Sequence, residues 1–154
     1  MTSLEDPFAT LLAKEQEQGA PATGGEAAQR DRAAARVDLG LSPSTEEDIV
    51  DLLAVGEELM TKARAGVTGR AVRAVVRQSG QMLILLAMPA GGGLPDHDAP
   101  GPASLQCLSG QAVLVAGDRS WSLRPGSAVM IPQERHEVRA LTDSLCVLAV
   151  SLPV

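Results

Sequence analysis

The 154-residue chain has almost no aromatic side chains, since Phe8 and Trp121 stand alone and tyrosine is absent. Single-stranded nucleic acids bind to platforms of stacked aromatic side chains, which this inventory cannot supply. The net charge is −6, and no basic run interrupts the sequence. A phosphate backbone attracts clustered Lys and Arg side chains. We therefore expect no nucleic-acid partner.

The chain also lacks the hydrophobic segments that address a protein to a membrane. Its first residues, MTSLEDPF, carry acids where a signal peptide carries bases, and no apolar region follows. No stretch reaches the roughly 18 apolar residues of a membrane-spanning helix. The two cysteines, Cys107 and Cys146, lie in apolar runs, which is typical of buried reduced thiols. We expect a cytoplasmic protein with no membrane partner.

The N-terminal part is acidic and low in complexity. Residues 1–43 carry seven acidic and four basic side chains, and the segment GAPATGGEAA at 19–28 has no apolar periodicity. A segment of this composition cannot bury enough apolar surface to fold alone. We expect residues 1–43 to form a flexible arm.

Residues 44–65 carry a firmer helical signal. Ser44 and Glu47 have the spacing of a capping box at a helix start. Apolar residues then recur at helical spacing: Ile49, Leu52, Leu53, Gly56, Leu59, Met60 and Ala63. The stripe predicts an amphipathic helix packed on the domain that follows. The alternative is a helix that binds a protein partner or a second copy of the chain.

After Gly66 the pattern changes to short apolar runs separated by Gly, Pro and Asp. These runs predict eight strands, at 71–77, 82–88, 104–108, 111–116, 120–123, 128–131, 136–140 and 145–150. Short strands with regular turn signals are typical of an all-β barrel or sandwich. No helical pattern separates the strands, which argues against a parallel βαβ sheet. We expect residues 66–154 to form this β-domain.

The chain contains only two histidines, His97 and His136. In the segment 135–140, strand alternation puts His136 on one face with Val138 and the charged side chains on the other. His136 should therefore face the core. A single inward histidine is more often a structural residue than a ligand. The spacing of the residues around both histidines is therefore needed to distinguish the two roles.

That spacing resembles the two motifs of the cupin family. The segment GGGLPDHDAPGPASLQCLSG, residues 91–110, matches the first motif at Gly91, His97 and Gly110. The segment GSAVMIPQERH, residues 126–136, matches the Gly and Pro positions of the second motif, and its histidine, His136, arrives one residue early. The resemblance covers a little over half of the chain. It implies an antiparallel jelly-roll β-barrel and a homodimer.

The departures from the motifs concern metal binding. In metal-binding cupins three histidines and a glutamate hold one divalent ion, whereas this chain has Ala99 and Ala103 at two of those positions. Only His97 and His136 remain as metal ligands. Zinc takes about four ligands, and non-haem iron takes two histidines and a carboxylate. A divalent metal (Fe, Mn, Zn or Ni) would be held weakly or would need a substitute ligand, for which the candidates are Asp96, Asp98, Glu134 and Cys107.

Three functions are compatible with these residues. The first is binding of a small molecule in the barrel interior, with His97, His136 and Cys107 as the ligand-binding residues. The second is a metal-dependent oxygenase or isomerase with a substitute third ligand. The third is a regulatory module whose acidic helix, residues 44–65, binds a protein. The shortage of aromatics favours the first, because small aliphatic side chains can leave a cavity unfilled.

Overall fold

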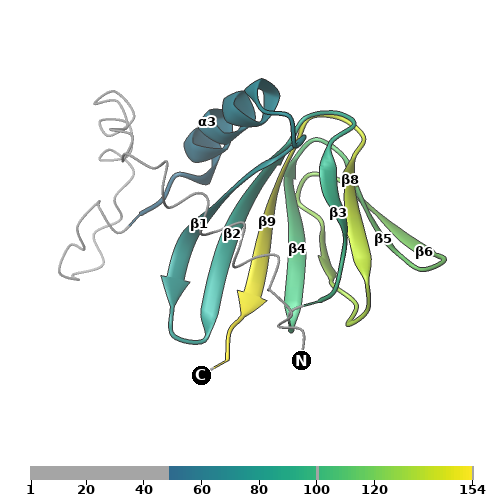
Figure 1. The fold of residues 1–154 in the computed structure, drawn as a ribbon. Coiled ribbons are helices and arrows are strands. Elements are labelled where there is room, and N and C mark those ends of the chain that lie inside the picture. The colour runs from purple at the N-terminus through teal and green to yellow at the C-terminus, as the bar shows by residue number, and fades with distance from the viewer. Residues whose placement is uncertain (1–48, 100, 154) are drawn as a thin grey trace.

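The computed structural model describes residues 49–99 and 101–153, which contain one helix and nine strands (Figure 1). The predicted arm, residues 1–43, lies outside the described residues, as does Ser44. Among the described residues, no helix has the length and apolar character to cross a membrane. The elements are α3 Leu52–Ala65, β1 Ala71–Gln78, β2 Gln81–Met88, β3 Gly93–His97, β4 Ala103–Ser109, β5 Ala112–Ala116, β6 Arg119–Leu123, β7 Ala128–Met130, β8 His136–Ala140 and β9 Ser144–Ser151.

The strands form two antiparallel sheets that face each other (Figure 1). The five-stranded sheet has the order β1-β2-β9-β4-β7, and the four-stranded sheet has the order β3-β8-β5-β6. The inward-facing side chains of both sheets pack into one core, which includes Ile84, Leu86, Leu105, Leu114, Val138 and Leu148. This arrangement confirms the all-β, jelly-roll prediction.

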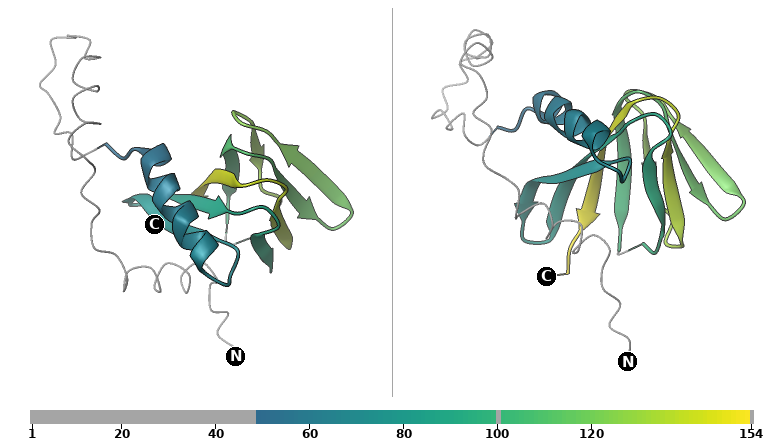
Figure 2. Two further views of the ribbon diagram at one scale, coloured as in Figure 1. Left: turned by 90° about the horizontal axis from the view of Figure 1, so that it is seen from above. Right: turned by 45° about the horizontal axis from the view of Figure 1, so that its top comes forward.

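The helix α3 covers the outer face of the five-stranded sheet (Figure 2). Its buried side presents Gly56, Leu59 and Ala63 to the sheet. Gly56 permits a close approach, because a Cβ atom there would lie 2.4 Å from Cδ2 of Leu145. The sheet side of this second cluster is formed by Ala71, Leu85, Ala87, Leu145 and Val147. Gly56, Leu59 and Ala63 of the predicted stripe are therefore buried against the barrel, as expected for a helix packed on the domain, whereas Ile49 and Leu53 are exposed.

The helix begins later than the capping box at Ser44 suggested. Residues 49–51 are not helical, and Asp51 is the N-cap. Its Oδ1 accepts hydrogen bonds from the backbone N–H groups of Leu53 and Ala54, both at 3.1 Å. A carboxylate here satisfies two N–H groups that lack helical partners and meets the positive end of the helix dipole. The prediction of a helix through residues 49–51 was wrong for this reason.

All eight predicted strands are present, and each boundary is either as predicted or shifted by one residue. The ninth strand, β3, was missed because its sequence, GLPDH, has little strand propensity and contains Pro95. β3 lies at the edge of its sheet, where a proline without an N–H group is tolerated. Its pairing with β8 is irregular between Leu94 and His97.

The packing of α3 can be tested with two leucines of the same helix. Leu59 is fully buried, whereas Leu53 is 61% exposed. We expect Leu59→Ala to lower the free energy of unfolding by about 2–5 kcal/mol. The matched control, Leu53→Ala, should change it by less than about 0.5 kcal/mol. Urea unfolding followed by circular dichroism measures both, and equal losses would contradict the described packing.

Candidate functional site

The two histidines lie side by side in the four-stranded sheet. His97 ends β3 and His136 begins β8, and the antiparallel register makes them direct cross-strand partners. Their ring centroids are 4.3 Å apart, and the ring planes meet at 64°, an edge-to-face contact. Residues that the chain separates by 39 positions thus form one pair at the end of the barrel.

Both rings are oriented by the backbone two residues earlier. Nδ1 of His97 lies 2.8 Å from the carbonyl oxygen of Pro95, and Nδ1 of His136 lies 2.9 Å from that of Glu134. A carbonyl oxygen can only accept, so each Nδ1 donates. In a neutral ring this leaves Nε2 as the acceptor. Histidines that ligate metals are oriented in the same way, by a hydrogen bond from the second ring nitrogen.

The surroundings keep His97 neutral. His136 is only 2% exposed, and His97 is partly buried. Burial lowers the pKa of His97 below its usual 6.5, and the neighbouring His136 lowers it further. The hydrogen bond to Pro95 and the charge of Asp96 oppose this shift without cancelling it. At neutral pH the His97 ring therefore offers an acceptor rather than a positive charge.

The carboxylates near the pair are held by arginines. Nε of Arg135 lies 2.8 Å from Oδ2 of Asp96, and its Nη1 lies 3.7 Å from Oδ2 of Asp98. Glu134 forms an ion pair with Arg119. Among residues 49–99 and 101–153, no three His, Cys, Asp or Glu side chains are grouped so that they could hold a metal. The donor set therefore does not fit a three- or four-ligand metal centre, and the predicted substitute ligand is not found.

Cys107 lies away from the histidines. The loop after His97 leads into β4 at Ala103, and Cys107 follows four residues later, about 13 Å along the strand. Cys107 is fully buried and pairs with Cys146 of β9. Of the three sequence-predicted site residues, the structure brings together His97 and His136 and leaves Cys107 toward the other end of the barrel.

Two loops connect the histidine pair with the five-stranded sheet. One loop, residues 98–102, joins β3 to β4, and the other, residues 131–135, joins β7 to β8. Nε2 of Gln133 donates to the carbonyl oxygen of Gly101 at 2.9 Å, and the Ile131 N–H donates to that of Ala103 at 3.0 Å. These bonds hold the two loops together at this end of the barrel.

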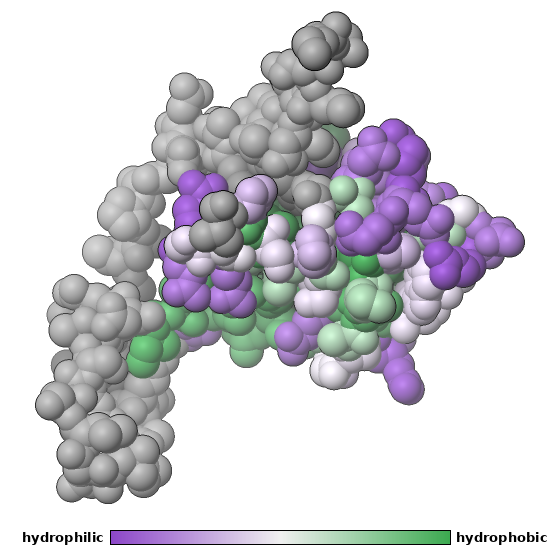
Figure 3. All heavy atoms as spheres, turned by 90° about the horizontal axis from the view of Figure 1, so that it is seen from below, coloured by the Kyte–Doolittle hydropathy of each residue, from purple (hydrophilic) through white to green (hydrophobic). Residues whose placement is uncertain are grey.

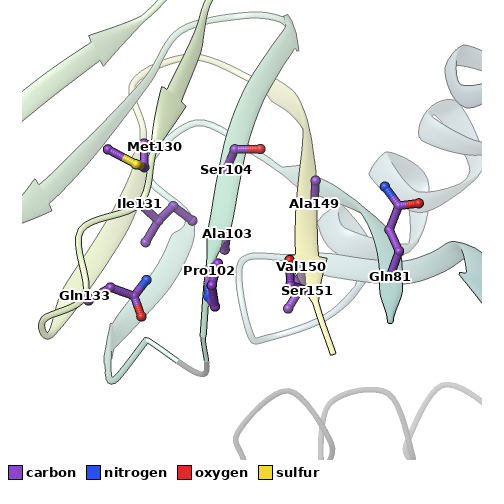
Figure 4. A pocket seen from close by; sticks show the side chains of 10 residues that line it. All are labelled: Gln81, Pro102, Ala103, Ser104, Met130, Ile131, Gln133, Ala149, Val150 and Ser151. Carbon is purple, nitrogen blue, oxygen red and sulfur yellow. The ribbon is translucent and has the colours of Figure 1, made fainter. Parts of the chain in front are cut away.

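A pocket of about 550 Å³ opens on the sheet side of these loops (Figure 4). The cross-strand partners Ser104 and Ala149 are among the residues that line it. Further lining residues include Gln81, Met130, Gln133 and Ser151, and no charged side chain contributes. Sequence reasoning missed this pocket because its residues come from four strands that no local motif connects. Neither histidine lines it, nor does Cys107.

The surface at this end of the barrel is mixed in character. Figure 3 views the molecule from below and shows hydrophobic side chains exposed between hydrophilic ones. Met130 is the most exposed of the large hydrophobic side chains near the pocket, at 81%. The pocket therefore favours neutral groups, whereas the histidine pair on the other sheet offers hydrogen-bond acceptors.

No protein-family model and no curated protein matches the sequence. Solved structures do match. A conserved protein of unknown function from Streptococcus pyogenes aligns with a TM-score of 0.56 and 19% identity, over 74% of this chain and 92% of that one. A cupin-2 domain protein from Shewanella frigidimarina aligns with a TM-score of 0.54 and 12% identity, over 71% and 100%. The described domain has the cupin fold.

Another matching structure is that of an enzyme. A mutant of the salicylate 1,2-dioxygenase from Pseudoaminobacter salicylatoxidans, in complex with gentisate, aligns with a TM-score of 0.56 and 14% identity. The alignment covers 64% of this chain and 32% of the dioxygenase. At these identities the likeness concerns the cupin fold, and function has to be argued from the site.

The lowered pKa of His97 predicts a pH dependence of stability. Because the folded pKa lies below the unfolded value of 6.5, the unfolded chain binds more protons between the two, and falling pH favours unfolding. We expect the urea concentration at the unfolding midpoint of the wild type to decrease as the pH is lowered from about 7 to about 5. The urea midpoint of His97→Gln should depend less steeply on pH. Above about pH 8 it should differ from the wild-type midpoint by a constant amount.

Urea titrations of both proteins at a series of pH values measure this effect. His136 and Arg135 also lower the pKa of His97, so both proteins keep these two residues and differ only at position 97. Parallel pH profiles for wild type and His97→Gln would contradict a stabilising neutral His97.

Proposed function

We propose that this cupin binds a small molecule at the barrel end that carries His97 and His136. The observation behind the proposal is the orientation of the two rings. Both Nδ1 atoms donate to backbone carbonyls, so Nε2 is the nitrogen that can accept a hydrogen bond when either ring is neutral, and the two rings are in edge-to-face contact. A ligand with N–H or O–H donors complements this pair. The His97 side chain is partly buried and its Nε2 atom is itself inaccessible to solvent, so a ligand reaches it only when the surrounding side chains move aside.

The charged side chains around the pair support a neutral ligand or one of small charge. Arg135 is engaged by Asp96 and Asp98 and is not placed to neutralise an anion on its own. The dioxygenase, part of which has a similar fold, is described in complex with the small molecule gentisate. For the present chain we infer the donor-bearing class of ligand from the acceptor pair alone.

A screen of small molecules against the histidine rings tests the proposal. Long-range ¹H–¹⁵N spectra report on Nε2 of both rings while a fragment library is added to the full chain. We expect binders to shift both Nε2 resonances and to lose affinity in His97→Gln. Ser104→Trp, which fills the neutral pocket on the other sheet, should leave them bound. Binding lost in Ser104→Trp and kept in His97→Gln would place the site in the pocket instead.

A divalent metal is expected to bind the pair weakly, because two imidazoles supply only half of a four-ligand site. The cupin motif suggests where a third ligand belongs, at Ala99. We expect Ala99→His to strengthen binding of added Ni²⁺ or Zn²⁺ by about tenfold or more, which corresponds to roughly 1.4 kcal/mol. Isothermal titration calorimetry measures the affinities.

The matched control is Ala54→His, which adds a histidine at an exposed position of α3. It should leave the affinity close to that of the wild type. Equal affinities for Ala99→His and Ala54→His would contradict the motif position. Near-stoichiometric metal that survives dialysis of the wild type would contradict the weak two-histidine site.

A further inference from the structure

The two cysteines of the chain are direct partners across two neighbouring strands. Cys107 of β4 lies opposite Cys146 of β9, and both side chains are fully buried in the barrel core. They come from positions 39 residues apart. The proposed ligand site at the histidines does not involve them.

The backbone shows which kind of cross-strand pair they form. The N–H of Cys107 donates to the carbonyl of Ser127 at 2.9 Å, and its own carbonyl accepts from the N–H of Gly126 at 2.9 Å. Both polar groups of Cys107 thus point toward the β7 side and away from β9. Cys107 and Cys146 are therefore a non-hydrogen-bonded pair, in which the Cα atoms lie about 4.5 Å apart and the side chains are close.

This spacing falls inside the range of about 4.4–6.8 Å that disulfides require between Cα atoms. The thiols are also close together, since each of them influences the pKa of the other. A bond between the sulfurs therefore needs side-chain rotation rather than movement of the strands.

We propose that Cys107 and Cys146 are a site of oxidation, at which a peroxide converts the two thiols into an intrachain disulfide. The Cys107 thiol loses its proton and the thiolate attacks one oxygen of hydrogen peroxide; an S–O bond forms, the O–O bond breaks, and the leaving hydroxide takes up that proton and departs as the first water. The sulfur of Cys146 then attacks this sulfenic acid, the S–S bond forms, the S–O bond breaks and the second water leaves. Two thiols lose two electrons, and one peroxide gains them.

Cys107 is the attacking residue because it lies nearer to the surface. Its thiol donates to the carbonyls of Ser109 at 3.4 Å and Gly110 at 3.6 Å, in the turn between β4 and β5, and Ser109 is exposed. Burial raises the pKa of both thiols, to about 12 for Cys146. The reaction should consequently be slow at neutral pH and should accelerate as the pH rises.

The same turn controls access to the thiols. The backbone N–H of Gln111 donates to Oγ1 of Thr142 at 2.9 Å, which ties the turn to the strand connection before β9. Opening of the turn exposes Cys107 to the oxidant. Removing this bond with Thr142→Val should accelerate oxidation several-fold. The matched control is Thr68→Val, because Oγ1 of Thr68 bonds the carbonyl of Arg70 in a different loop.

The test uses the full chain, purified reduced and treated with hydrogen peroxide. We expect both thiols to be lost together, with an intact mass lower by two hydrogen atoms and an unchanged circular dichroism spectrum. The urea midpoint should rise, and dithiothreitol should restore both thiols. Cys146→Ala should stop at a sulfenic acid on Cys107, which dimedone traps.

Other products would overturn the proposal. Two intact thiols in Thr142→Val, under conditions that consume free glutathione, would show that the pair is not oxidised in the folded barrel. A disulfide between two chains, or a sulfinic acid on one cysteine of the wild type, would show that the cross-strand geometry does not direct the reaction.

Discussion

The strand β9 is the constraint on which the rest of the barrel depends. It lies between β2 and β4 in the five-stranded sheet and is buried on both faces. Cys146, Leu148 and Val150 face the barrel core, while Leu145 and Val147 face α3. Removing a buried aliphatic side chain here would leave a cavity in one of the two clusters. Because β9 alone joins β2 to β4 in this sheet, the five-stranded sheet is complete only when β9 has paired with both.

The closure of the barrel also produces the candidate site. The loops 98–102 and 131–135 cross between the sheets, and the bonds from Gln133 and Ile131 hold them together. Each histidine stands next to one of these loops, and its ring is turned by the carbonyl two residues before it. The arrangement of the two histidines is thus a product of strand pairing and short local hydrogen bonds.

The barrel separates two kinds of chemistry along its axis. The histidine pair and the neutral pocket share one end, whereas the two thiols lie toward the other. Near the histidines the carboxylates are committed to arginines, so Asp96, Asp98 and Glu134 stabilise the loops rather than a metal. With alanine at the two motif positions 99 and 103, the histidine pair therefore has no third metal ligand beside it among the described residues.

The sequence by itself determined most of the strands and the inward direction of His136. Alternation of apolar and polar residues is a local property. It correctly puts His136 and Val138 together on the buried face of β8. Only the tertiary structure decided the rest. The segment GLPDH forms β3 because it pairs with β8 at the edge of the four-stranded sheet, and α3 begins at Leu52 with Asp51 as its N-cap. The pairs His97–His136 and Cys107–Cys146 depend on register between distant strands, which no local pattern encodes.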